Sequence, residues 1–194
     1  MVRRCKWVYN DVLMTKYHDN EWGVPQHDDI VLFEFLTLEG MQAGLSWSTI
    51  LKKRENFRNA FDNFNYNKIS EYNEGKLEKL LQNKGIIRNR LKIQAVITNS
   101  KAFIKIQEEF GSFDNYLWGF ANNIPILNTW QSLDELPSRT ELSDKISKDL
   151  KKRGFKFIGS TIIYAFMQAV GLVNDHIIDC FRYDEIKNNF SPIK

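Results

Sequence analysis

The chain has 194 residues and a formal net charge of +3, and hydrophobic residues make up 43% of it. This length suits one domain with a full hydrophobic core, and so mild a charge does not by itself indicate a nucleic-acid partner. No run reaches the roughly 18 apolar residues that a membrane span needs. The amino terminus has basic residues without an apolar stretch behind them, so we expect no secretory signal. We therefore expect a cytoplasmic protein without membrane contact, whose two cysteines stay reduced.

Helical periodicity runs through most of the chain. Residues 28–44 open with two aspartates suited to a helix start and then repeat apolar residues every three or four positions. Residues 76–121 predict two or three further helices, which break at Gly85 and Gly111. Residues 132–154 predict another helix, which a serine or threonine opens and a glycine closes.

The fold class follows from this pattern. No segment alternates convincingly between polar and apolar residues over six positions, and no Pro/Gly/Ser-rich linker divides the chain. We therefore predict an all-α protein, a helical bundle that forms a single domain over residues 1–194 and has a short irregular amino-terminal arm. We also expect a monomer, because no long heptad seam of apolar residues is visible.

One acidic residue, Glu39, lies in an apolar run at the end of the first predicted helix, beside a glycine turn at residues 40–44. Most glutamates at helix ends are exposed, and the local pattern favours that position. The alternative is a carboxylate that points into a pocket with aromatic neighbours, which would suit a cationic or amino-bearing flat ligand. We expect Glu34, on the opposite face, to be solvated.

Residues 149–172 read as a helix, a tight turn and a second helix. Gly154 and Gly159 bracket the turn and let backbone N–H groups approach a ligand closely. Ser160 or Thr161 is expected to cap the second helix. Apolar residues then follow at helical spacing, which buries one face of that helix.

Basic side chains surround this turn. Lys151, Lys152 and Arg153 end the first helix, and Lys156 lies in the turn. Backbone amides at a helix amino terminus, with cations nearby, make a DNA phosphate the natural anion. The segment is similar to the helix-hairpin-helix element of DNA-repair proteins, which binds the DNA backbone without reading its sequence. The alternative is a glycine-terminated helix whose basic residues complement the helix dipole, and the residues leave both open.

Each of the two cysteines has a histidine nearby. His176 and Cys180 are four residues apart, which on a helix would place them on one face, and His18 follows Cys5 by thirteen residues. If the ends of the chain meet, the four form a tetrahedral Cys₂His₂ zinc site with no position left for water, which makes the metal structural. The alternative is two buried cysteines and two histidines without a metal. We expect the remaining histidine, His27, at the surface or in a turn.

Four stretches that span nearly the whole chain resemble the signatures of the 3-methyladenine DNA glycosylase I family. The stretches are YHDNEWGVP (17–25), LEGMQAGLSWSTILKKRENF (38–57), KGIIRNRLKIQAVI (84–97) and LKKRGFKFIGSTIIYAFMQAVGLVNDH (150–176). The resemblance implies a helix-hairpin-helix DNA glycosylase fold, with the hairpin at about residues 143–171. It also implies a structural Zn²⁺ that joins the two ends of the chain. The implied ligands are Cys5 and His18 within residues 1–24, and His176 and Cys180 within residues 172–183.

The base pocket of the family maps onto Glu39, Tyr17, Trp47 and Trp7. In the family pattern, Glu39 would be the catalytic residue, an acidic side chain that hydrogen-bonds the damaged base. Trp47 would stack on that base. Members of this family tend to carry a tyrosine at the position of Met14, a departure that bears on the shape and affinity of the pocket and not on the reaction class. Many helix-hairpin-helix glycosylases have a catalytic aspartate after the hairpin, but this family is thought to work without one, so Asp175 is not expected to act as a base.

The resemblance implies base-excision repair by a monofunctional DNA glycosylase. Such a hydrolase would flip 3-methyladenine out of double-stranded DNA that contains alkylated adenine and cleave its N-glycosidic bond. The residues expected to contact DNA are Gly154, Lys156, Gly159, Lys152, Arg153, Gln42 and Leu45, of which the last two would fill the space left by the base. Two alternatives are a non-catalytic DNA-binding module that kept the hairpin and the zinc, and a glycosylase with a broader range of alkylated purines.

Overall fold

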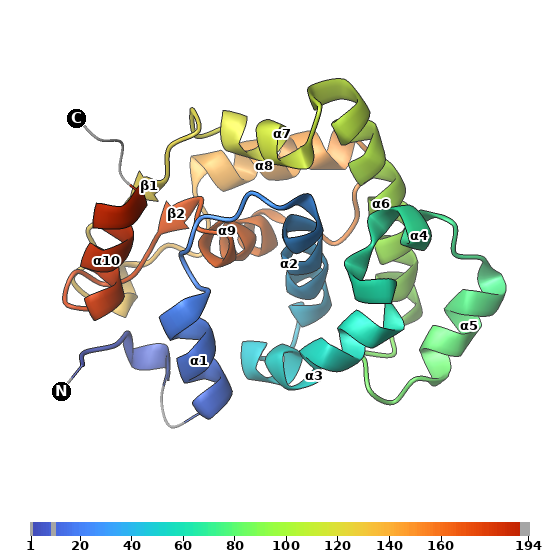
Figure 1. The fold of residues 1–194 in the computed structure, drawn as a ribbon, viewed down its shortest axis with the longest axis horizontal. Coiled ribbons are helices and arrows are strands. Elements are labelled where there is room, and N and C mark those ends of the chain that lie inside the picture. The colour runs from blue at the N-terminus through green and yellow to red at the C-terminus, as the bar shows by residue number, and fades with distance from the viewer. Residues whose placement is uncertain (1, 9–10, 191–194) are drawn as a thin grey trace.

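Helices form almost all of the regular structure in the computed structural model, which describes residues 2–8 and 11–190 (Figure 1). The helices are η1 (Lys6–Val8), α1 (Val12–Asn20), α2 (Asp29–Gln42), α3 (Trp47–Ala60), η2 (Asp62–Phe64), α4 (Tyr66–Ser70), α5 (Glu74–Gln82), α6 (Arg90–Phe110), α7 (Phe113–Gly119), η3 (Leu133–Glu135), α8 (Glu141–Lys152), α9 (Ser160–Ala169) and α10 (Phe181–Phe190). Two short strands, β1 (Ile126–Leu127) and β2 (Val173–Asn174), pair in parallel. The predicted all-α class is confirmed. The predicted single domain also includes residues 1, 9–10 and 191–194, which lie outside the described residues.

Local sequence signals account for most helix ends. Asp28 caps α2 by accepting hydrogen bonds from the backbone of Ile30 and Val31. Gly111 ends α6 with a φ of 86°. The predicted break at Gly85 falls in the loop between α5 and α6. Thr140 opens α8 with a capping box.

Two predicted boundaries are wrong. The turn expected at residues 40–44 begins later, because α2 continues to Gln42. The irregular amino-terminal arm contains the nine-residue helix α1, which Asp11 caps by accepting hydrogen bonds from two backbone N–H groups. A mixed sequence with low amphipathicity concealed this short helix, since capping and packing against its neighbours stabilise it more than its own periodicity does.

Helix α2 lies at the centre of the molecule, and α3, α6 and α9 pack around it (Figure 1). Every residue from 32 to 41 is buried, so this helix has no solvated face. The expectation that Glu34 is solvated is therefore wrong. Its side chain is 8% exposed and pairs with Arg54 at 2.6 Å and Arg58 at 2.9 Å. These ion pairs compensate the negative charge of the Glu34 carboxylate, which α2 places in the core.

The two ends of the described chain meet on one side of the molecule, where α1 and α10 lie near each other (Figure 1). The backbone N–H of Gly23 donates to the backbone oxygen of Gln168 at 2.9 Å, and that of Phe181 donates to the backbone oxygen of Arg3 at 3.0 Å.

At the surface, His27 contacts Asp114 at 2.8 Å with 58% of its side chain exposed, which confirms the position expected for it. Within the described residues, no helix has the length and apolarity that crossing a membrane requires.

Gly171 is the closest backbone contact at this junction. It has a φ of 70°, and a Cβ atom there would lie 2.3 Å from the carbonyl carbon of Val24. We expect Gly171→Ala to lower the free energy of unfolding by at least about 2 kcal/mol, because neither backbone segment can move freely. Gly119→Ala is the matched control, since a Cβ atom at that position would meet nothing within 4 Å. Urea unfolding that shows equal stability for the two variants would contradict this packing.

Candidate active site and metal centre

A cavity of about 280 Å³ lies between η1, α1, α2, α3 and α9. The five residues of its wall that the sequence predicted are Trp7, Tyr17, Glu39, Gln42 and Trp47. The structure thus brings together, from four separate elements, the four residues expected to form the base pocket. It adds Gln42, one of the two residues expected to fill the space that the extruded base leaves in the DNA. The size and mixed aromatic and polar lining are those of a small-molecule site.

Glu39 is buried in this wall and 4% exposed, so its expected exposure as a helix-end residue is wrong. The central position of α2 is the reason, because even its last turn is covered by neighbouring helices. No hydrogen bond or ion pair joins the Glu39 carboxylate to another described residue. Burial raises its pKa to about 8. A carboxyl group in such surroundings favours a ligand that brings a positive charge or a hydrogen-bond donor.

Aromatic rings form much of the remaining wall. The rings of Tyr17 and Trp47 lie 5.3 Å apart at an angle of 52°, and those of Trp7 and Trp22 are 5.0 Å apart and nearly perpendicular. Burial, and then the charge of Glu39, raise the pKa of Tyr17 well above its ordinary value, which keeps its hydroxyl protonated. The cavity therefore offers flat, electron-rich faces beside one acid, an arrangement that attracts a flat cation.

The turn after α2 lies beside this cavity. Gln42, Leu45 and Glu39 also line an adjoining hollow, which the first turns of α9 close on the other side. Leu45 is 41% exposed there. Lys92 of α6 holds the turn in place, since its ammonium group donates to the backbone oxygens of Met41 at 2.9 Å and Ala43 at 2.6 Å.

Sequence reasoning missed part of the cavity wall. Trp22, Leu136, Ala165 and Gln168 line it together with Met14, where the family resemblance leads us to expect a tyrosine. Trp22 belongs to the signature at residues 17–25, which was a usable signal, whereas nothing in the local sequence marked the others. Asp175 does not line the cavity. It is 1% exposed and accepts four hydrogen bonds from neighbouring side chains, which leaves no free oxygen to act as a base.

The predicted helical hairpin is α8, a turn at residues 153–159, and α9. Gly154 has a φ of 97°, while Gly159 is the N-cap residue of α9 and has no side chain to cap it. The expectation that Ser160 or Thr161 caps α9 is wrong, because both are already helical. Ser160 instead contacts the hydroxyl of Ser143 at 2.9 Å and so joins the two helices.

The hairpin turn packs directly on the helix that carries Glu39. A Cβ atom at Gly40 would lie 3.3 Å from the backbone oxygen of Phe157, so glycine allows this close approach. Asn99 of α6 fixes the same turn, because its amide donates to the backbone oxygen of Lys156 and accepts from its N–H, at 3.0 and 2.8 Å. The hairpin turn is therefore held against the helix that supplies Glu39 to the cavity.

The basic residues of the hairpin differ in their surroundings. Lys152 and Lys156 are exposed. Arg153 pairs with Asp149 and Glu109, both at 2.6 Å, and lies over the ring of Phe110. Its guanidinium group is thus committed to contacts within the protein, whereas the two lysines are available to an anionic partner.

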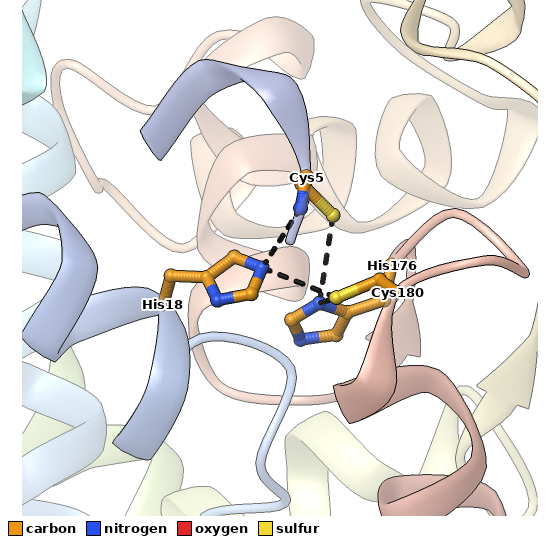
Figure 2. A group of neighbouring side chains, drawn as sticks. All are labelled: Cys5, His18, His176 and Cys180. Carbon is orange, nitrogen blue, oxygen red and sulfur yellow. Dashed lines mark hydrogen bonds between the residues drawn. The ribbon is translucent and has the colours of Figure 1, made fainter. Parts of the chain in front are cut away.

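The four predicted metal ligands converge from both ends of the chain (Figure 2). All four are buried, and their ligand atoms lie within 4.8 Å of one another. The Cys180 sulfur is 3.4 Å from His18 Nε2 and 3.4 Å from His176 Nδ1, which is 3.7 Å from the Cys5 sulfur. A tetrahedral zinc site with ordinary bond lengths places its ligand atoms about 3.3 to 3.8 Å apart. The cluster therefore fits a tetrahedral metal ion.

Outer hydrogen bonds orient both imidazoles toward the centre of this cluster. His18 contacts Asp19 through Nδ1 at 2.8 Å, and His176 donates from Nε2 to the carbonyl of Trp22 at 3.0 Å. Each ring keeps its other nitrogen for the cluster, as metal-binding histidines do. The Cys5 thiol, followed by the two histidines, lowers the pKa of Cys180, which favours a thiolate. His176 and Cys180, which a helix would place on one face, lie instead in the loop between β2 and α10.

Comparison with known proteins agrees with this geometry. The family model described as methyladenine glycosylase matches residues 7–183. DNA-3-methyladenine glycosylase 1 of Escherichia coli is 50% identical over 182 residues, which cover 94% of this chain and 97% of that protein. A crystal structure of 3-methyladenine DNA glycosylase I superposes with a TM-score of 0.90 at 53% identity, covering 92% of this chain and 98% of the other. The 3-methyladenine DNA glycosylase I of Staphylococcus aureus gives a TM-score of 0.89 at 34% identity, with 92% and 95% covered.

A helical hairpin beside an acidic, aromatic cavity defines the class of helix-hairpin-helix DNA glycosylases, and the similar structures share this all-α fold. Within that class, the chain belongs to the methyladenine glycosylase family. The resemblance predicted from four sequence stretches is thereby confirmed.

The buried carboxyl group of Glu39 makes the free energy of unfolding depend on pH. Its pKa is about 8 in the folded protein and ordinarily near 4.5, so the folded state holds a proton that the unfolded state releases between these values. The contribution of Glu39 to the free energy of unfolding therefore falls as pH rises from 4.5 to 8. Glu39→Gln removes this dependence, and we expect the variant to match the wild type near pH 4.5 and to exceed it by more than about 1 kcal/mol at pH 8.

Urea unfolding at several pH values measures this difference. Glu108→Gln, on an exposed part of α6, is the matched control and should show no such trend. A stability difference between Glu39→Gln and wild type that stays constant from pH 4.5 to 8 would show that Glu39 is not buried as a carboxyl group.

Proposed function

We propose that this chain is a DNA-3-methyladenine glycosylase that hydrolyses the bond between 3-methyladenine and deoxyribose in alkylated DNA, the first step of base-excision repair. The observation that carries this proposal is the buried, unpaired Glu39 in an aromatic cavity beside the hairpin. The similar Escherichia coli protein is named for this activity, and the Staphylococcus aureus structure describes 3-methyladenine recognition. Both support the same substrate here.

The chemistry of the substrate sets what the protein has to do. Methylation at N3 gives the adenine base a positive charge, and cleavage of the N-glycosidic bond returns the bonding electrons to the base and makes it neutral. Water adds to C1′ of the sugar and loses a proton to solvent. Because the leaving group is already good, no protein acid needs to protonate it, which agrees with an Asp175 that is fully occupied by hydrogen bonds.

Glu39 and Trp47 would select the charged base. The ionised Glu39 complements the positive charge and accepts a hydrogen bond from the exocyclic amino group. An indole face such as that of Trp47 favours a cationic ring over a neutral one by about 0.5 to 2 kcal/mol. Tyr17 and Trp7 complete the aromatic wall. Undamaged adenine lacks the charge that both interactions require.

The hairpin and the turn after α2 would hold the extruded nucleotide. Extrusion costs a few kcal/mol, less for a damaged base than for a normal one. Lys152, Lys156 and the backbone amides between Gly154 and Gly159 would bind phosphates and offset this cost. Gln42 and Leu45, in the hollow that adjoins the cavity, would fill the space that the base leaves in the DNA.

The metal of the Cys₂His₂ cluster would be a structural Zn²⁺. The two thiols and two oriented imidazoles are the donor set that zinc prefers, and four protein ligands leave no position for a reacting water. When bound, the ion would supply a cross-link between Cys5 and His18 at one end of the chain and His176 and Cys180 at the other. Double-stranded DNA as the bound form, a monomeric state and a cytoplasmic location remain predictions from the sequence.

One observation favours a second candidate with a broader range of alkylated purines. Met14 lines the cavity, and a flexible, polarisable thioether adapts to ligands of different shape. Chromatography of the bases released from methylated DNA separates the two candidates, since the broader enzyme would also release methylated guanines.

Excision should depend on the ionisation of Glu39. The pKa of about 8 in the free protein predicts that kcat/KM rises with pH up to about 8, because only the ionised carboxylate complements the cationic base. Glu39→Gln is expected to lower single-turnover excision about 100-fold and to abolish this rise, at the scale of a lost charged hydrogen bond. Unchanged excision by a folded Glu39→Gln protein would refute the assignment of the cavity.

Loss of a ligand should release the metal and weaken the junction of the two ends. We expect Cys180→Ala to bind less than about one tenth of the wild-type zinc and to lose about 3 kcal/mol or more of stability. Elemental analysis and thermal unfolding measure both quantities. Wild-type protein that carries no metal after purification and gains no stability from added Zn²⁺ would contradict the proposed site.

A further inference from the structure

Gln168 of α9 is a polar residue in the cavity wall that the proposed mechanism does not use. Its side-chain amino group donates to Asp175 Oδ2 at 2.7 Å. Within the described part of the chain, no group donates a hydrogen bond to the amide oxygen at the other end of this side chain. A half-buried amide with one end held and the other free presents a single kind of hydrogen-bonding group to a ligand.

Asp175 decides which end of the amide is held. It is 1% exposed, and its Oδ1 accepts from Asn128 at 2.6 Å and from the indole of Trp130 at 2.8 Å. Its Oδ2 accepts from the hydroxyl of Tyr164 at 2.6 Å besides Gln168. An ionised carboxylate only accepts, so Gln168 has to direct its amino group to Asp175 and its oxygen away from it.

We propose that Gln168 is a specificity-determining residue, whose amide oxygen is the second hydrogen-bond acceptor, beside Glu39, for the exocyclic amino group of the bound base. Asp175 is the positioning residue that fixes this orientation. The proposal rests on the proposed function and deepens it, because it identifies the exocyclic amino group as the part of the purine by which the cavity recognises its substrate. An exocyclic amino group has two N–H donors, one for each acceptor.

Two acceptors discriminate against a base with an oxygen at that position. The 6-amino group of an adenine donates to both, whereas the 6-oxo group of a guanine faces both with its own lone pairs and leaves them unpaired. Sites built on such groups reject the mismatched ligand strongly, because repulsion adds to the lost hydrogen bonds. The substrate class is therefore N3-alkylated 6-aminopurines.

The experiment measures single-turnover release of 3-methyladenine and 3-methylguanine from the same methylated DNA, for the metal-loaded full chain. The quantity compared is the rate for 3-methyladenine divided by the rate for 3-methylguanine. Gln168→Leu should lower this ratio about tenfold, the factor expected for one hydrogen bond. Asp175→Asn should lower the ratio similarly, because an asparagine can accept from Trp130 while its own amino group turns the Gln168 amide around. Both lesions are cationic, so the lost charge of Asp175 cancels in the ratio. Gln82→Leu, at the exposed end of α5, is the matched control and should leave the ratio unchanged.

The outcomes separate this inference from the proposed function. A Gln168→Leu protein that folds and keeps the wild-type ratio overturns the inference while the glycosylase assignment stands. A lower ratio in Gln168→Leu together with a wild-type ratio in Asp175→Asn overturns the positioning role of Asp175. If the wild-type protein releases neither base, the proposed function fails, and the inference fails with it.

Discussion

The cavity depends on the burial of the Glu39 carboxyl group, with which no cation of the described residues pairs. Burial alone raises its pKa to about 8, because ionising a carboxyl group inside the protein is costly, and a positively charged ligand would offset this cost. Nearby cations do not relieve this cost. The charge of Arg54 acts on Tyr17 in the cavity wall, but Glu21 and Glu34 already pair with this arginine, at 2.5 and 2.6 Å. A cationic base is therefore the partner that this carboxylate lacks.

The metal cluster and the cavity share their walls, which links the stability of the fold to its function. Trp7 follows Cys5 by two residues, and Tyr17 directly precedes His18. Trp22 lines the cavity with its indole and holds His176 with its carbonyl. Closure of the two chain ends thus places the aromatic rings, while α6 holds the turn after α2 and the hairpin through separate hydrogen bonds.

Much of this structure was predictable, and the misses share one physical cause. Capping residues and apolar periodicity predicted most helices, and the spacing of Cys5, His18, His176 and Cys180 predicted a cluster that the structure forms. The pattern around Glu39 could not show that α2 is covered on every side, so the local sequence favours exposure for both of its glutamates, and only the family resemblance places Glu39 in a pocket. Gln168 carried no local signal, because its importance comes from a partner in a loop beyond its own helix. Tertiary packing, which a local window does not contain, made these differences.

The most direct test of this account is an NMR titration of the Glu39 side-chain carboxyl carbon. In the free protein the account predicts a midpoint near pH 8, and a clearly lower midpoint when a cationic 3-methyladenine nucleoside analogue occupies the cavity. A free-protein midpoint near the ordinary value of about 4.5, or one that the analogue leaves unchanged, would contradict it.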